Sequence, residues 1–165
     1  MTGKAKTIPD GYHTLTPQLI VRGAMQAIEF YQRAFGATLI SASPDGPGGK
    51  ITHATLKMGD SILMLSDEFA EWKCLGPESI GGTPVTIHVY VENVDEVFQR
   101  AVNEGASVAM PLQDQFWGDR YGQVVDPFGH RWSLATHVEN LTREEIAQRS
   151  AAIFGDVWKK AVASS

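Results

Sequence analysis

The chain has 165 residues, 43% hydrophobic and 20% charged, which is the balance of an ordinary soluble globular protein. Its formal net charge is −5, and no lysine and arginine cluster outweighs the acidic residues, which argues against nucleic acid or an anionic membrane as a partner. No apolar run approaches the length of a membrane span, and the first residues lack the apolar core of a secretory signal. The single cysteine, Cys74, agrees with a reducing compartment, so we expect a cytoplasmic protein.

The first half of the chain predicts the order β-α-β-β-β. Residues 1–11 are polar and are expected to form a flexible arm. Residues 12–21 are strand-like, and residues 24–35 carry apolar side chains at helical spacing before a glycine stop. Three further strands are expected at residues 37–42, 51–58 and 61–66.

The second half repeats this order at an offset of about 70 residues. The segment VRGAMQAIEFYQRAFGA, which starts at Val21, aligns with VENVDEVFQRAVNEGA, which starts at Val91. A helix is expected at 94–104, with strands at 85–91, 106–110, 121–125 and 130–136. The sequence therefore predicts two copies of one βαβββ module, at about 12–66 and 85–137, with the loop 67–84 between them.

Three segments carry a family resemblance: TPQLIVRGAMQAIEFYQRAFGA, ITHATLKMGDSILMLSDE and QFWGDRYGQVVDPFGHRWSLATH. With them the chain resembles the vicinal oxygen chelate superfamily, and within it the PhnB-like branch of the glyoxalase/bleomycin resistance/dioxygenase family. The likeness covers about residues 12–137, which we expect to form a single domain. It implies an α+β fold in which two βαβββ modules, with curved mixed sheets, form an open cleft with the helices outside. It also implies a homodimer.

The resemblance further implies a divalent metal held by four ligands, two from each module. The matching positions are Thr16 and Thr86 on the first strands, Ser133 on the last strand, and either Leu63 or Met64 in the first module. None of these side chains offers the carboxylate or imidazole that such metals prefer. We therefore expect no cofactor at this position, with a divalent metal in a rearranged site as the alternative.

Strand parity predicts which side chains line the cleft. If Thr16 and Thr86 point inward, Gln18 and His88 do so too, because alternate residues of a strand share a face. The repeat makes His53 and Gln123 equivalent. The predicted lining is a polar set with two tryptophans nearby: Gln18, His53, His88, Tyr121, Gln123, Ser133, Trp117 and Trp132.

Structural roles are the alternatives for these residues. A histidine on a half-buried strand is more often a hydrogen-bonded structural group than a ligand or a base, which applies to His53 and His88 alike. Trp117 and Trp132 are alternatively core residues. Asp119 and Arg120 are predicted to form an ion pair that orders their loop.

Three functions remain open from the sequence. The first is a metal-independent protein that binds a small organic molecule, in the manner that resemblance to bleomycin-binding members implies. The second is an enzyme of lyase, isomerase or dioxygenase type, with His53 and His88 as a rearranged metal site or as a general base. The third, a structural protein with a vestigial cleft, is the least favoured, because a dead cleft would not need so many polar groups.

Two segments lie outside the repeat. The loop 67–84 carries apolar side chains at Phe69, Trp72 and Leu75, and we expect it to act as a lid. In the extension 138–165, Thr142 and Glu145 have the spacing of a capping box. An amphipathic helix is expected to follow, packed on the subunit or across a dimer, with this apolar stripe: Ile146, Ala147, Ser150, Ile153, Phe154, Val157 and Trp158.

Overall fold

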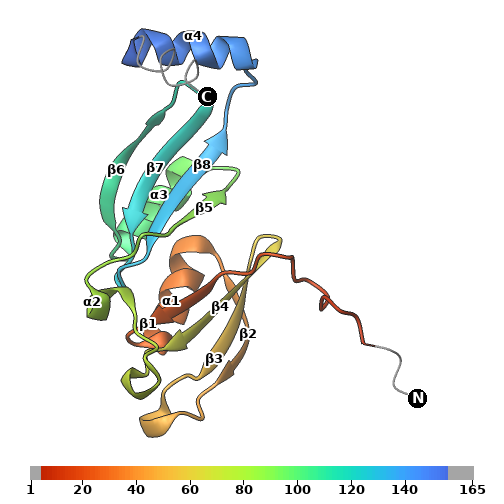
Figure 1. Cartoon of the computed structure of the whole chain (residues 1–165), viewed down its shortest axis with the longest axis vertical. Helices are drawn as coiled ribbons and strands as arrows, with labels where there is room; N and C mark the ends of the chain where they lie inside the picture. The colour runs from red at the N-terminus through yellow and green to blue at the C-terminus, as the bar shows by residue number, and fades with distance from the viewer. Residues whose placement is uncertain (1–4, 156–165) are drawn as a thin grey trace.

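The computed structural model describes residues 5–155 and contains two four-stranded sheets (Figure 1). The first has the order β1-β4-β3-β2 and the second the order β5-β8-β7-β6, with one parallel pair in each, β1 with β4 and β5 with β8. The identical orders confirm the predicted repeat. The first module consists of β1 (Gln18–Val21), α1 (Ala24–Phe35), β2 (Thr38–Ser43), β3 (His53–Met58) and β4 (Ser61–Asp67). The second consists of β5 (Thr86–Tyr90), α3 (Val94–Asn103), β6 (Ser107–Asp114), β7 (Asp119–Val125) and β8 (Arg131–His137).

Each module begins its helix with a side chain from the end of its last sheet strand. The Asp67 carboxylate accepts hydrogen bonds from the N–H groups of Gly23 and Ala24, the first unpaired donors of α1. At the equivalent place in the second module, Thr136 Oγ1 accepts from the N–H of Val94. These bonds fix each helix on one face of its own sheet.

The two helices also pack against each other in one shared hydrophobic core. Arg100 Nε in α3 donates to the carbonyl of Ala34 in α1 at 2.9 Å, and Arg33 pairs with Glu104 at 2.6 Å. Each helix thus packs on the other helix as well as on its own sheet. The faces of the two sheets turned away from the helices, called here the helix-free faces, therefore do not enclose each other within one chain.

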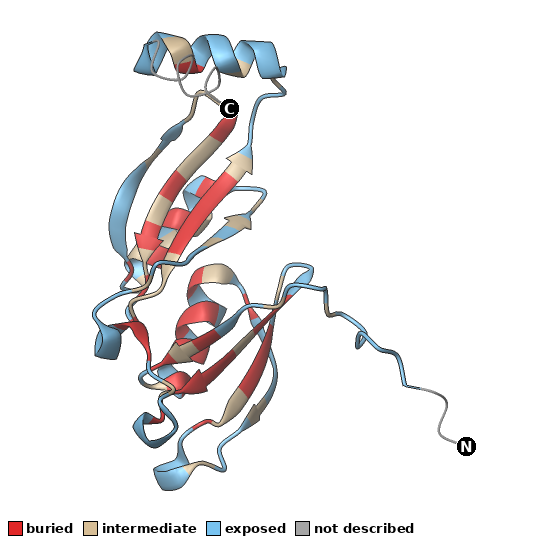
Figure 2. Cartoon of the chain, viewed as in Figure 1, coloured by how far each residue is buried: buried red, intermediate tan, exposed pale blue. Residues whose placement is uncertain are grey.

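Burial follows this arrangement. Figure 2 shows buried residues along the inner strands, whereas the edge strands β2 and β6 are largely exposed. Along β5, Ile87 and Val89 pack against the shared core, and the alternate residues Thr86, His88 and Tyr90 are exposed on the helix-free face. The predicted two-residue periodicity is thus present in the structure.

The loop between the modules contains a short helix, α2 (Pro77–Ile80), and is held to the first module. The Glu68 carboxylate accepts bonds from Ser79 Oγ at 2.7 Å, the Gly76 N–H at 3.1 Å and Arg22 Nε at 3.0 Å. The Ser79 and Gly76 bonds, with Arg22, lower the pKa of Glu68 to about 2. Phe69 is buried, but Trp72 is 61% exposed. The role of this loop as a lid stays a prediction.

The C-terminal helix α4 (Arg143–Phe154) crosses the end of the second sheet (Figure 1). The predicted capping box is confirmed, because Thr142 accepts from the N–H of Glu145 and the Glu145 carboxylate accepts from the N–H of Thr142. Ile153 and Phe154 are exposed, and Val157 and Trp158 lie outside the described residues. Over residues 5–155, no helix has the length and apolarity that a bilayer crossing requires.

Tyr31 tests the shared core. Its hydroxyl donates to Asp126 Oδ2 at 2.7 Å across the two modules, and burial, with the Asp126 carboxylate alongside, raises the pKa of Tyr31 well above its usual range. We expect Tyr31→Phe to lower the free energy of unfolding by about 1–3 kcal/mol, the cost of one buried bond to a charged acceptor. Urea denaturation measures this. Tyr12→Phe, in the segment before β1, is the control and should change stability by less than about 0.5 kcal/mol. Equal effects of the two substitutions would contradict the role given to Tyr31.

Candidate functional site

The helix-free face of the second sheet brings predicted lining residues together. Strand register places His88 on β5 opposite Ser133 on β8, and Ser133 in turn opposite Gln123 on β7. These three side chains therefore form a row across three strands. Tyr121, two residues before Gln123, lies on the same face.

Hydrogen bonds fix this row. His88 Nδ1 lies 2.7 Å from Ser133 Oγ, and Gln123 Nε2 donates to the Tyr121 hydroxyl at 2.6 Å. The Arg131 guanidinium, on the same face of β8, donates from Nη1 to Gln123 Oε1 at 3.2 Å. Side chains that hold one another in this way are positioned before any ligand arrives.

Aromatic rings flank the row. The His88 ring lies 4.6 Å from that of Tyr90 and is nearly parallel to that of Tyr121, at 6.0 Å and 18°. The Trp117 ring meets Tyr121 edge-on at 5.5 Å. Trp117, Tyr121 and His88 thus form a wall with flat, partly exposed surfaces, which suits stacking with an organic ring.

Asp119 organises one end of this wall. Its buried carboxylate accepts from Tyr90 Oη at 2.9 Å and Trp117 Nε1 at 3.0 Å, and it pairs with His137 Nδ1 at 2.8 Å. The predicted Asp119–Arg120 ion pair is wrong: Arg120 pairs with Asp95 and Asp114. Because neighbouring strand residues point to opposite faces, Asp119 and Arg120 have no shared side on which to meet.

Ionisation at this end follows from the contacts. Burial acts to raise the pKa of Asp119, but the hydrogen bonds from His137, Tyr90 and Trp117 outweigh it, so the pKa lies below its usual range. The bond to Asp119 also raises the pKa of His137, and the contact with Asn140 adds to this. Asp119 is therefore an anion at neutral pH.

The helix-free face of the first sheet carries the other predicted residues. Gln18 on β1 lies opposite Met64 on β4, and Met64 lies opposite Thr55 on β3. His53 Nε2 contacts Thr55 Oγ1 at 3.1 Å. The equivalent of Gln123 is therefore Thr55, which corrects the predicted equivalence with His53. Both alignments place His53 on the helix-free face.

Trp132 is the predicted lining residue that the structure places elsewhere. It is 1% exposed and faces the helices, where its ring lies 4.9 Å from that of Phe35 and its indole N–H donates to Asp126 at 2.8 Å. Its predicted position beside Ser133 on the cleft face is wrong, because adjacent strand residues point to opposite faces. The core alternative holds for Trp132.

The family's metal positions can also be compared with the structure. Register makes Met64 the equivalent of Ser133, whereas Leu63 is buried on the helix side. The donor set is therefore Thr16, Thr86, Met64 and Ser133, whose hydroxyl and thioether groups do not fit a divalent metal. Within residues 5–155, no three His, Cys, Asp or Glu side chains gather where they could hold a metal ion.

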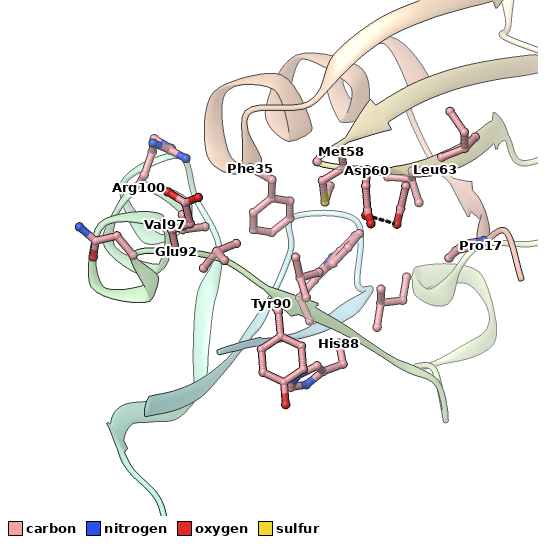
Figure 3. A pocket seen from close by; sticks show the side chains of 18 of the residues that line it. Pro17, Phe35, Met58, Asp60, Leu63, His88, Tyr90, Glu92, Val97 and Arg100 are labelled. Carbon is pink, nitrogen blue, oxygen red and sulfur yellow. Dashed lines mark hydrogen bonds between the residues drawn. The ribbon is translucent and has the colours of Figure 1, made fainter. Parts of the chain in front are cut away.

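A cavity of about 810 Å³ lies in the seam between the modules, and His88 and Tyr90 of β5 are among the residues that line it. It is bounded by the β3–β4 hairpin, β5 and α3, and its walls include Phe35, Met58 and Val97. Figure 3 shows His88 and Tyr90 on the far side of β5 from Phe35 and Met58. The apolar seam and the polar row thus lie on opposite sides of β5, and His88 and Tyr90 border both.

Two residues of the polar face were absent from the predicted lining, Tyr90 and Arg131. Both lie two residues from a predicted one, Tyr90 from His88 and Arg131 from Ser133. Strand parity alone would have found them.

Comparisons with known proteins agree with this fold. The family model described as Glyoxalase/Bleomycin resistance protein/Dioxygenase superfamily matches residues 12–134. An uncharacterized protein of Mycobacterium tuberculosis is 49% identical over 135 residues, which is 80% of this chain and 79% of that protein. The crystal structure of TioX from Micromonospora sp. ML1 is 31% identical, with a TM-score of 0.61 over 76% of this chain and 99% of that one. A PhnB protein from Bacillus cereus, 24% identical with a TM-score of 0.57 over 75% of this chain and 99% of that one, shares the fold.

The Asp119–His137 pair predicts a pH dependence. Because the pKa of His137 is raised in the folded state, its contribution to stability is full below the ordinary histidine pKa of about 6.5 and is lost as pH rises through the folded value. We expect Asp119→Asn to lower the pKa of His137, as measured by an NMR titration of its imidazole. Asp114→Asn removes a carboxylate that pairs with Arg120 instead and is the control. A His137 pKa that is the same in all three proteins would refute the coupling.

Proposed function

The chain belongs to the glyoxalase/bleomycin resistance protein/dioxygenase superfamily, as its motifs predict, and on that premise we propose that it binds a small organic molecule against the polar row. The carrying observation is the set of interlocked side chains on the helix-free face of the second sheet, His88, Ser133, Gln123 and Tyr121. Pockets for small molecules combine apolar or aromatic walls with a few fixed polar groups. The row and its flanking rings supply both.

A second copy of the chain supplies the opposite wall in this proposal. Since the helices share one core, neither helix-free face is covered by the other module. Large apolar side chains remain exposed along the sheets, among them Ile40, Tyr90 and Val108. These side chains are available for contact with a second copy. In a symmetric dimer, the first sheet of each copy closes over the second sheet of its partner, so His53 and His88 meet from different chains.

The dimer proposal is tested by mixing two variants. A ligand is first found by a thermal-shift screen of small organic molecules and measured by calorimetry. We expect His53→Ala and His88→Ala each to weaken its binding about 5- to 30-fold, the loss of one hydrogen bond and its ring contacts, with little loss of fold stability. In a cleft built between chains, mixed dimers of the two variants regain one intact cleft out of two.

The control for this experiment is a mixture of two differently tagged His88→Ala chains, which restores nothing. Equal binding by the mixed dimers and the single variants would place the cleft within one chain. Full affinity in both single variants, with a marked fall in melting temperature, would show instead that the two histidines are structural.

The enzymatic alternative depends on the same pair of residues. Two imidazoles from different chains are suited to sharing a metal or to moving a proton. Elemental analysis of protein purified without chelator separates the two functions. Binding without metal predicts less than about one-tenth of a zinc, nickel, manganese or iron ion per chain, because the chain's own donors fit such ions poorly. Stoichiometric metal that is lost in His53→Ala and His88→Ala would favour the enzyme.

A further inference from the structure

Arg131 is a cation on the polar face, and no carboxylate of residues 5–155 pairs with it. The one side-chain hydrogen bond of Arg131 within residues 5–155 goes to the neutral amide of Gln123. The neighbouring arginine, Arg120, is by contrast paired with two aspartates. Glu78 borders the same hollow as Arg131 but pairs with Arg22 at 3.5 Å.

The direction of the hydrogen bonds beside Arg131 is fixed by chemistry. A guanidinium can only donate, so the Gln123 oxygen must face it and the Gln123 amide N–H must face Tyr121. The Tyr121 oxygen is thereby an acceptor, and its own proton is left to donate elsewhere. Arg131 likewise keeps donors beyond the one that Gln123 uses. At one end of this hydrogen-bonded series the Arg131 guanidinium has N–H groups to donate, and at the other end the Tyr121 hydroxyl has an O–H group to donate.

The surroundings leave room for a ligand at Arg131. The side chain is half-buried and borders a hollow of about 210 Å³ that also touches Gln18 and Ile20 of β1. A second hollow of about 390 Å³ lies between Arg131 and the turn after α2. Gln18, a predicted lining residue, is thus brought to the same hollow as Arg131, and its amide adds a further donor.

From this geometry we infer that the ligand carries an oxyanion, a carboxylate or phosphate group, which Arg131 binds while Tyr121 donates to a second oxygen of the same molecule. The inference rests on the proposed function and specifies its ligand class. In a protein of net charge −5, a guanidinium that pairs with no carboxylate of residues 5–155 favours an anionic ligand. A planar guanidinium matches a carboxylate or phosphate with two parallel bonds. The rings of His88, Tyr121 and Trp117 then hold the organic part of the ligand.

Two matched probes test the charge. 2-Naphthoate and 2-naphthamide share one ring system and differ in the anionic group. We expect naphthoate to bind the wild-type protein about 10-fold more tightly than naphthamide, with NMR shifts at Tyr121 and Gln123, and we expect Arg131→Gln to abolish this preference. Arg131→Lys, which keeps the positive charge but not the planar guanidinium donors, should retain part of the preference for naphthoate. Arg143→Gln, which removes a charge from α4, is the control and should leave the preference intact.

The outcomes separate this inference from the proposed function. If both probes shift the Tyr121 and Gln123 signals with equal affinity, small-molecule binding stands and the anion site is overturned. If neither probe binds, the anion site is overturned, and the function is decided by the ligand screen with the histidine variants. If Arg131→Gln dissociates a dimer, as measured by light scattering, without changing the acid preference, the guanidinium pairs with the partner copy and the anion site is again overturned.

Discussion

The angle between the two modules depends on one buried carboxylate. Asp126 is 4% exposed and receives hydrogen bonds on both oxygens, from Tyr31 Oη and Trp132 Nε1 on one and from the N–H groups of Phe128 and His130 on the other. An ionised carboxylate is costly to bury unless it is fully hydrogen-bonded, and here every donor lies within 2.9 Å. Tyr31 comes from α1 and the other donors come from the second module. The carboxylate therefore receives all four hydrogen bonds only when the modules meet at this angle.

The position of the candidate site follows from that angle. Holding Tyr31 against Trp132 brings α1 beside α3, so the core uses the helix-bearing faces of both sheets. The polar residues of the two sheets are then left on the opposite faces. A protein whose helices lay apart could close its own cleft, whereas the proposed function takes the second wall from another copy. The buried contact between Asp126 and Tyr31 is thus the reason that the proposed function includes a second copy.

Much of this fold could be predicted from the sequence, because the repeat and the periodicities are local. The offset between Val21 and Val91 predicts two modules, and the identical sheet orders confirm it. The misplacement of Trp132 was avoidable, since a neighbour of the inward-facing Ser133 must face the core. Other features could not be read from the chain. The contact of α1 with α3 brings together residues that no local pattern relates. Asp119 and His137 are instead cross-strand neighbours in the β7–β8 hairpin.

Asp119, like Asp126, is a buried carboxylate that accepts several hydrogen bonds. It lies at the open end of the second sheet, where one of its partners, His137, can titrate. Tyr90 and Trp117 donate to it at any neutral pH, and the lowered pKa of Asp119 keeps the acceptor charged. His137 loses its charge as pH rises, yet the neutral tautomer that retains the Nδ1 proton still donates to Asp119. The lost proton then comes from Nε2, which faces Asn140 Oδ1 at 3.1 Å, and a half-turn of that amide replaces the acceptor with an N–H donor. Asp119 therefore keeps its hydrogen bonds to Tyr90 and Trp117 in both charge states of His137. The rearrangement that follows deprotonation takes place at the exposed amide of Asn140 and not at the aromatic wall.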